Sequence, residues 1–196
     1  LSWQEGADSV LQQTLFSGGS GTEADPYQIA SLEGMRYLSE HPAYWSDHFI
    51  QTADINAAAT SEWNSDGNGG YYGFSPIGDS TVHFTGSYNG NDKSISNLVI
   101  NRSGTDHIGL FGYLSGNVHN LTISDASITG GDYTGILCGQ IEGAEGDSCL
   151  VDQCTISGAV TLDSLANYGG GLVGHAKYSV FTNCSASDSL SGNECI

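Results

Sequence analysis

The chain has 196 residues and carries 22 Asp and Glu against 4 Lys and Arg, a formal net charge of −18. Binding to nucleic acid requires Lys and Arg that displace counterions from phosphate, so this composition argues against nucleic acid, anionic lipid surfaces and polyuronates as partners. No apolar run approaches the ~18 residues of a membrane span, so membrane insertion is not expected. The acidic balance and a start at Leu1 rather than Met fit a processed, secreted protein of an extracellular medium or cell surface.

The N-terminal part predicts an arm, a strand and a helix. Residues 1–16 form an N-terminal arm or linker, either an amphipathic helix or an extended segment. A Gly-rich loop then enters a short strand at residues 27–29. The best helix lies near residues 31–41, where Ser31 can cap the N-terminus. We expect this helix to cap one end of a single domain that covers residues 17–196.

A polar loop, "NSDGNGG", follows the next strand. Asn64, Asp66 and Asn68 stand at alternate positions, as in the first half of an EF-hand loop. Ser75 occupies the place where such a loop needs a bidentate Glu. A plain flexible loop and a weak Ca²⁺ site are therefore the two alternatives, and no other cofactor is expected.

Four aromatic residues cluster in and beside this loop. If exposed, they form a platform that contacts a sugar or a protein, and if folded inward they cover the flank of the domain. These residues are Trp63, Tyr71, Tyr72 and Phe74. After them, two strands between residues 82 and 102 are joined at residues 89–92 by an Asn- and Gly-rich turn, like a hairpin.

The second half of the chain repeats one phrase, with a period of about 20 to 35 residues. Each copy has an opening and a closing glycine around apolar residues, followed by a short strand that begins with Asn or Gln. The opening glycines are Gly109, Gly135 and Gly171, the closing ones are Gly112, Gly139 and Gly174, and the strands begin at Asn97, Asn120, Gln153 and Asn183.

Such a period indicates a solenoid, because each copy is too short to bury its own apolar face. The predicted fold class is all-β, a parallel β-solenoid (β-helix) with a short N-terminal capping helix. Leu98, Leu121, Cys154 and Cys184 are expected to stack in one column, and the isoleucines 123 and 156 in another. The glycines mark corners that need positive φ or close backbone approach, and the Asn residues share one corner.

The segments "GLFG", "GILCG" and "GGLVG" resemble the GLUG motif of bacterial secreted and surface proteins. The upstream order "GGSGTEADPYQI", helix, "FIQTADI" and "FTGSYNGNDKSISNLVIN" is similar to the usual opening of GLUG-containing β-helix regions. The resemblance covers about residues 16 to 190, with GLUG-like coils from about residue 95. It implies an adhesin-like β-helix architecture and says little about activity.

A non-catalytic structural or adhesive module, extracellular or at the cell surface, is the function that we expect, with a protein or glycan surface ligand as partner. The acidic residues of the repeats do not recur at one position of the stack, and no motif of a metalloprotease or serine hydrolase occurs. One alternative is a carbohydrate-active β-helix enzyme that acts on a neutral glycan with two carboxylates.

The other alternative is a subunit that binds copies of itself head-to-tail in a filament. In this hypothesis the arm of one copy covers the open last coil of the next. The apolar residues that could make this contact are Trp3, Val10, Leu11, Leu15 and Phe16. Five Cys leave at least one thiol unpaired or paired to another chain, and we expect Cys154 and Cys184 to be buried free thiols.

Overall fold

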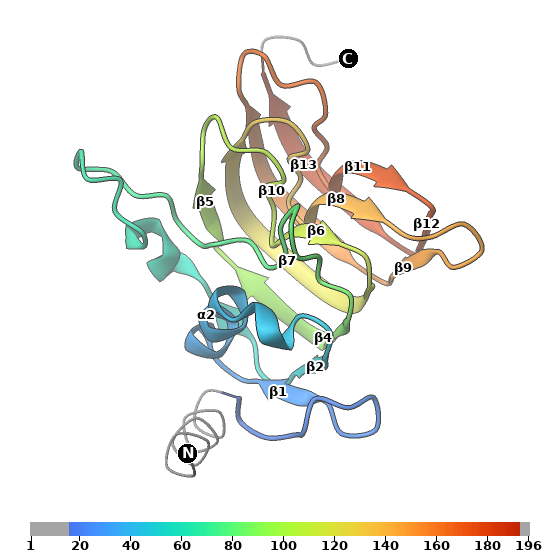
Figure 1. Cartoon of the computed structure of the whole chain (residues 1–196). Helices are drawn as coiled ribbons and strands as arrows, with labels where there is room; N and C mark the ends of the chain where they lie inside the picture. The colour runs from blue at the N-terminus through green and yellow to red at the C-terminus, as the bar shows by residue number, and fades with distance from the viewer. Residues whose placement is uncertain (1–15, 193–196) are drawn as a thin grey trace.

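The chain winds into a parallel β-solenoid with one α-helix in the computed structural model, which describes residues 16–192 (Figure 1). In chain order the elements are β1 (Tyr27–Ile29), α2 (Leu32–Glu40), the 3-10 helix η1 (Pro42–Tyr44), β2 (His48–Gln51), β3 (Ile55–Asn56), the 3-10 helix η2 (Ala58–Glu62), β4 (Ser87–Ser96), β5 (Val99–Asn101), β6 (Phe111–Leu114), β7 (Asn117–Gly130), β8 (Cys138–Glu142), β9 (Cys149–Asp152), β10 (Thr155–Leu162), β11 (Val173–Lys177), β12 (Ser179–Thr182) and β13 (Ser185–Ser191).

Two sheets form the walls of the solenoid. The larger sheet follows the order β1-β2-β4-β7-β10-β13, and the smaller sheet follows β11-β8-β6. All pairings between the named strands are parallel, so each coil lies on the previous one in the same direction. The predicted fold class is therefore confirmed.

The predicted strand and helix near the N-terminus are confirmed. The Ser31 side chain accepts a hydrogen bond from the Gly34 N–H at 3.1 Å and caps α2. Met35 and Leu38 face the core. The Trp45 indole N–H donates to the Leu38 carbonyl oxygen at 2.8 Å. In Figure 1, α2 lies beside β1 and β2, at the N-terminal end of the stack.

Columns of apolar side chains fill the space between the walls. Ile95, Ile123 and Ile156 are in register in successive coils, and all three are fully buried. Leu121 and Cys154 are also buried. The pairing of β10 with both neighbours places Leu121, Cys154 and Cys184 in one column. These parts of the predicted stack are correct.

Leu98 and Asn97 are not in the predicted column. Leu121 pairs with Lys93, whereas the Asn97 N–H donates to the carbonyl oxygen of Ser124, three residues further along β7. Asn120 does share its corner with Gln153 and Asn183, and all three have φ between +53° and +55°. The misplacement arises because Asn97 also has a positive φ, 58°, at a different corner.

The turn at residues 89–92 is likewise a corner and not a hairpin. Asn91 and Asp92 have φ of 52° and 57°, but β4 continues through them and pairs in parallel with β7. The same left-handed residues serve hairpins and solenoid corners, so the local sequence does not distinguish the two.

The closing glycines of the repeat stack on one another but do not occupy corners. Gly112, Gly139 and Gly174 lie inside β6, β8 and β11, in mutual register. A Cβ atom at Gly139 would collide with the backbone of Tyr133 and His107. Close backbone approach, and not positive φ, therefore requires glycine at these positions.

Phe16 belongs to the core of its own chain, which contradicts its predicted role in assembly. Its ring packs against the rings of Tyr27, Tyr37, Tyr44 and Phe49 at centroid distances of 4.8 to 5.6 Å. The side chain is 1% exposed, so it cannot contact another copy. Trp3, Val10, Leu11 and Leu15 lie outside the described residues.

Within residues 16–192, no helix has the length and apolar character needed to cross a membrane. The four described cysteines are free thiols, with Cys138, Cys149 and Cys154 buried and Cys184 partly exposed. The fifth, Cys195, lies outside the described residues.

Candidate functional site

The predicted aromatic cluster is divided between the surface and the core. Tyr71 and Tyr72 are 42% and 44% exposed, on a loop that projects from the body of the solenoid (Figure 1). Phe74 is fully buried, which contradicts its predicted place on an exposed platform. Its backbone N–H donates to the Val99 carbonyl oxygen and fixes this end of the loop to β5. Trp63 is half-buried, and its ring stacks on that of Phe74 with the ring centroids 6.4 Å apart.

The polar side chains of the predicted calcium loop form hydrogen bonds with the backbone of the same loop. Asp66 Oδ1 accepts the Asn68 and Gly70 N–H groups at 2.7 and 2.9 Å, which lowers the pKa of Asp66. Asn64 Nδ2 donates to the Gly73 carbonyl oxygen at 2.7 Å. No group of three or more His, Cys, Asp or Glu that could hold a metal occurs among residues 16–192. The Ca²⁺ site, which relies on two Asn, stays a prediction.

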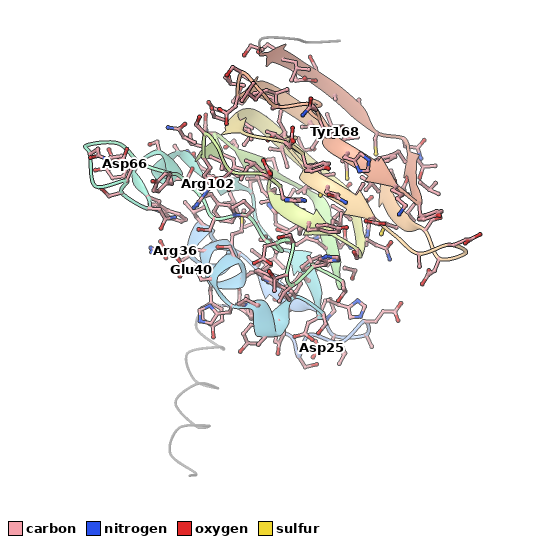
Figure 2. All side chains as sticks on the ribbon, turned by 45° about the horizontal axis from the view of Figure 1, so that its top comes forward. Asp25, Arg36, Glu40, Asp66, Arg102 and Tyr168 are labelled. Carbon is pink, nitrogen blue, oxygen red and sulfur yellow. The ribbon has the colours of Figure 1, made fainter. Side chains whose placement is uncertain are left out.

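Two of the few cationic side chains lie beside this loop. The Arg36 guanidinium lies 4.9 Å from the Trp63 ring centroid, and that of Arg102 lies 5.6 Å from the Tyr72 centroid. Figure 2 places both arginines on the side of the molecule from which the Asp66 loop projects. Sequence reasoning missed this pairing, although the scarcity of cations was a signal that could have drawn attention to Arg36 and Arg102.

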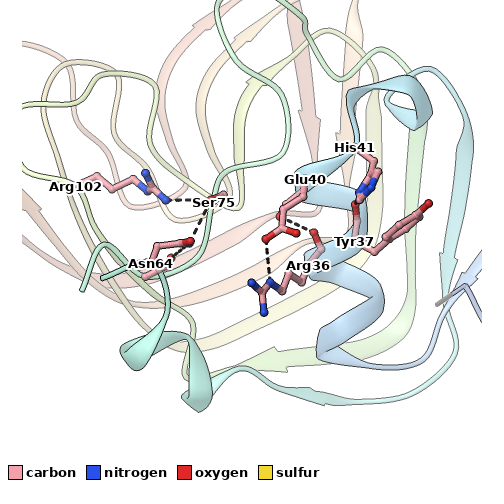
Figure 3. A network of polar contacts seen from close by, with 9 residues as sticks. Arg36, Tyr37, Glu40, His41, Asn64, Ser75 and Arg102 are labelled. Carbon is pink, nitrogen blue, oxygen red and sulfur yellow. Dashed lines mark hydrogen bonds and ion pairs between the residues drawn. The ribbon is translucent and has the colours of Figure 1, made fainter. Parts of the chain in front are cut away.

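Arg102 is anchored at the base of the loop. It follows β5, and its Nε donates to the Phe74 carbonyl oxygen at 3.3 Å and its Nη2 to Ser75 Oγ at 3.0 Å (Figure 3). Asn64 Nδ2 also reaches Ser75 Oγ, at 3.4 Å. Burial lowers the pKa of Arg102, and the neighbouring Tyr72 opposes that shift. An arginine stays protonated at any ordinary pH despite such a shift.

A groove of ≈ 610 Å³ lies at another place, beside β6 and β8, and includes His83, Tyr113, Glu142 and Asp147 in its lining. Tyr113 donates to Glu142 Oε2 at 2.5 Å, and Lys177 Nζ lies 2.6 Å from Glu142 Oε1. The Lys177 and Tyr113 hydrogen bonds lower the pKa of Glu142 to about 2. Glu142 is thus held as a fully engaged carboxylate.

A ladder of stacked rings runs along the smaller sheet. In order along the stack, its members are His83, Tyr113, His107, Tyr133 and Tyr168, with successive centroids 3.6, 5.6, 4.9 and 4.9 Å apart. All four pairs are stacked face to face, so most ring faces are covered by a neighbouring ring. The ladder therefore stabilises the coil-to-coil contact and offers a ligand few open ring faces.

No family model matches the chain. The chain is 39% identical over 176 residues to Halomucin of Haloquadratum walsbyi, which covers 86% of this chain and 2% of Halomucin. It is 37% identical over 122 residues to a provisionally named Gly-rich membrane protein of Evansella cellulosilytica, 59% of this chain and 13% of that protein. The chain thus spans a small part of both relatives.

Among solved structures, a chain provisionally named an immunoglobulin A1 protease, from Bacteroides ovatus, is similar with a TM-score of 0.50. The identity is 16%, and the match covers 91% of this chain and 70% of that one. This likeness concerns the fold, and it agrees with the β-solenoid described above.

Proposed function

We propose that this chain is a non-catalytic β-solenoid module of an extracellular or cell-surface protein, with a structural and adhesive role. The observation that carries the proposal is the match between this stack of coils and small sections of much longer proteins. One of them is named Halomucin, and the other is provisionally named a Gly-rich membrane protein. A solenoid suits such a section because each coil contacts only its neighbours, so coils can be added in series.

We also propose that the segments "GLFG", "GILCG" and "GGLVG" are GLUG motifs, although "GILCG" has Ile136 where the motif has its second Gly. The stacking of Gly112, Gly139 and Gly174 in one row supports this assignment. The lack of space for a Cβ atom gives each of them a structural reason to be glycine.

The state of Glu142 argues against this residue as the general acid of a glycosidase. A glycosidase acid needs a raised pKa, whereas the pKa of Glu142 is lowered to about 2. The hydrogen bonds to Lys177 and Tyr113 also engage both of its oxygens. Such a carboxylate is a poor general acid and a weak general base.

Adhesion is tested with fluorescent beads that carry the purified chain. Their retention is measured on a panel of immobilised neutral and acidic glycans and surface proteins, and soluble products are analysed at the same time. We expect retention without release of sugar fragments. Retention on no surface would refute the adhesive role, and steady release of reducing sugar would replace it with an enzymatic one.

Head-to-tail self-assembly is a second candidate, supported by exposed apolar side chains of β12. Val180 and Phe181 are 46% and 37% exposed. Neighbouring exposed apolar side chains are typical of interaction sites. Sedimentation over a range of concentrations tests this candidate. Association should be lost in Val180→Lys and kept in Leu165→Lys, whose site is 88% exposed in the loop between β10 and β11.

A further inference from the structure

The base of the Tyr71–Tyr72 loop has hydrogen-bond donors that the contacts within residues 16–192 do not use. Ser75 Oγ accepts from Arg102 Nη2 and Asn64 Nδ2, which occupy its lone pairs. Its own O–H is then left to donate to solvent or to a ligand. The guanidinium of Arg102 also has more N–H groups than its bonds to Phe74 and Ser75 use.

The charge of Arg102 is also uncompensated. In the described part of the chain, the ion pairs are Arg36–Glu40 and Lys177–Glu142, and Arg102 is in neither. The Arg102 side chain is partly buried. The chain carries 22 Asp and Glu and a net charge of −18, yet none of these carboxylates forms an ion pair with Arg102 within residues 16–192. Burying a charge without a partner is costly, so an anion at this position would be stabilising.

We propose that Arg102 and Ser75 bind the carboxylate of an acidic saccharide, and that the exposed rings of Tyr71 and Tyr72 pack against its sugar ring. The proposal rests on the adhesive function above and names its ligand class. A planar guanidinium matches a carboxylate in shape and forms charge-assisted hydrogen bonds with it. The Ser75 hydroxyl adds a second type of donor from the same side.

The exposed tyrosines favour a saccharide over a free anion. An aromatic ring offers a flat apolar face to the C–H groups of a sugar, and its hydroxyl reaches the sugar's polar edge. Tyr72 already has Arg102 beside it at 5.6 Å, so one ligand can contact the ring and the guanidinium together.

Net charge selects a ligand with a single carboxylate. A polyuronate would be repelled by the remainder of a chain that carries −18 charges. A phosphate group carries more charge than a carboxylate and suffers more of this repulsion. A monosaccharide or a glycan end with one acidic group can still bind the Arg102 guanidinium, and the acidic chain repels it less than it repels a polyuronate or a phosphate.

The test uses the full chain and NMR titration with methyl β-glucuronide. The uncharged methyl ester of this sugar and methyl β-glucoside serve as matched probes, and acetate and inorganic phosphate serve as anions without a ring. We expect the glucuronide to bind about 10-fold more tightly than its methyl ester and than acetate or phosphate. Equal affinity for the ester, acetate or phosphate, or no binding of the glucuronide, would overturn the proposal.

Three variants locate the site. Arg102→Lys keeps the charge but loses the planar fork, and should weaken glucuronide binding about 10-fold. Tyr72→Ser should weaken the glucuronide and the ester alike, because both lose the ring contact. The control is Tyr178→Ser, a tyrosine that is 45% exposed with the Lys177 Nζ 5.1 Å from its ring centroid. This cation is already paired with Glu142.

Unchanged near-UV circular dichroism of each variant confirms that the fold is intact. Equal losses in Tyr72→Ser and Tyr178→Ser, or full binding by Arg102→Lys, would exclude this site. Beads that adhere without any preference for the glucuronide would refute the saccharide site and leave the adhesive function standing. Beads that adhere to nothing would refute the adhesive function itself.

Discussion

Replacing Ile123 by alanine tests whether the column of isoleucines holds the solenoid together. Ile123 is fully buried and paired in register with Ile95 on one side and Ile156 on the other. The change removes the Cγ2, Cδ1 and Cγ1 atoms, each worth about 0.8 kcal/mol when transferred from water. The cavity left between two stacked neighbours adds to this loss. We therefore expect a decrease of about 3 to 4 kcal/mol in the free energy of unfolding.

Urea titration followed by far-UV circular dichroism measures this decrease. Two variants serve as controls: Ile123→Val, expected to cost about 1 kcal/mol, and Leu165→Ala, expected within about 0.5 kcal/mol of the parent. Leu165 is 88% exposed, so its side chain makes little contact with the core that truncation could remove. If Ile123→Ala and Leu165→Ala unfold at the same urea concentration, Ile123 is not inside and the coil register is incorrect.

Further predictions concern a corner, a carboxylate and two thiols. Asn120 has φ of 55°, so Asn120→Ala should lower stability by about 1 to 2 kcal/mol, whereas Asn120→Gly should melt within a few degrees of the parent. The folded-state pKa of Glu142 is lowered to about 2, so its contribution is complete above its usual pKa of 4.5 and is lost as the pH falls toward 2. Acid unfolding of Glu142→Gln should accordingly depend less on pH in that window, and an unchanged dependence would contradict the Lys177 interaction. Native alkylation followed by peptide mapping should label Cys184 first, while the pKa of Cys154, raised to about 12, and its burial delay its reaction until denaturation. Protection of both thiols in denaturant would mean a disulfide instead.

The sequence predicted the fold well where a repeat fixes the register. The row of closing glycines and the column that contains Leu121 each repeat in three coils, so the register of one coil supports that of the next. Asn97 was misplaced because it belongs to an earlier, irregular coil, and because left-handed residues occur at more than one corner. Positive φ is a local requirement, whereas the choice between a corner and a hairpin depends on which strand lies alongside.

The candidate site was predicted only in part, for a different reason. The aromatic cluster was visible in the sequence, but the burial of Phe74 depends on its contact with β5, which no local pattern encodes. Arg102 and Ser75 are 27 positions apart and meet only because successive coils stack. Which of their donors remain for a ligand depends on the assembled loop, and it could not be deduced from either residue alone.

The last two rings of the ladder give the protein an intrinsic optical reporter. The Tyr133 and Tyr168 rings are 4.9 Å apart and within 3° of parallel (Tyr168 is labelled in Figure 2). Phenol chromophores in such an arrangement couple electronically and produce a near-ultraviolet circular dichroism band. Tyr168 precedes β11, so local unfolding of β11–β13 separates the two rings and removes this band, even while the other coils stay folded. Local unfolding of this coil can thus be followed without a label and separated from global unfolding.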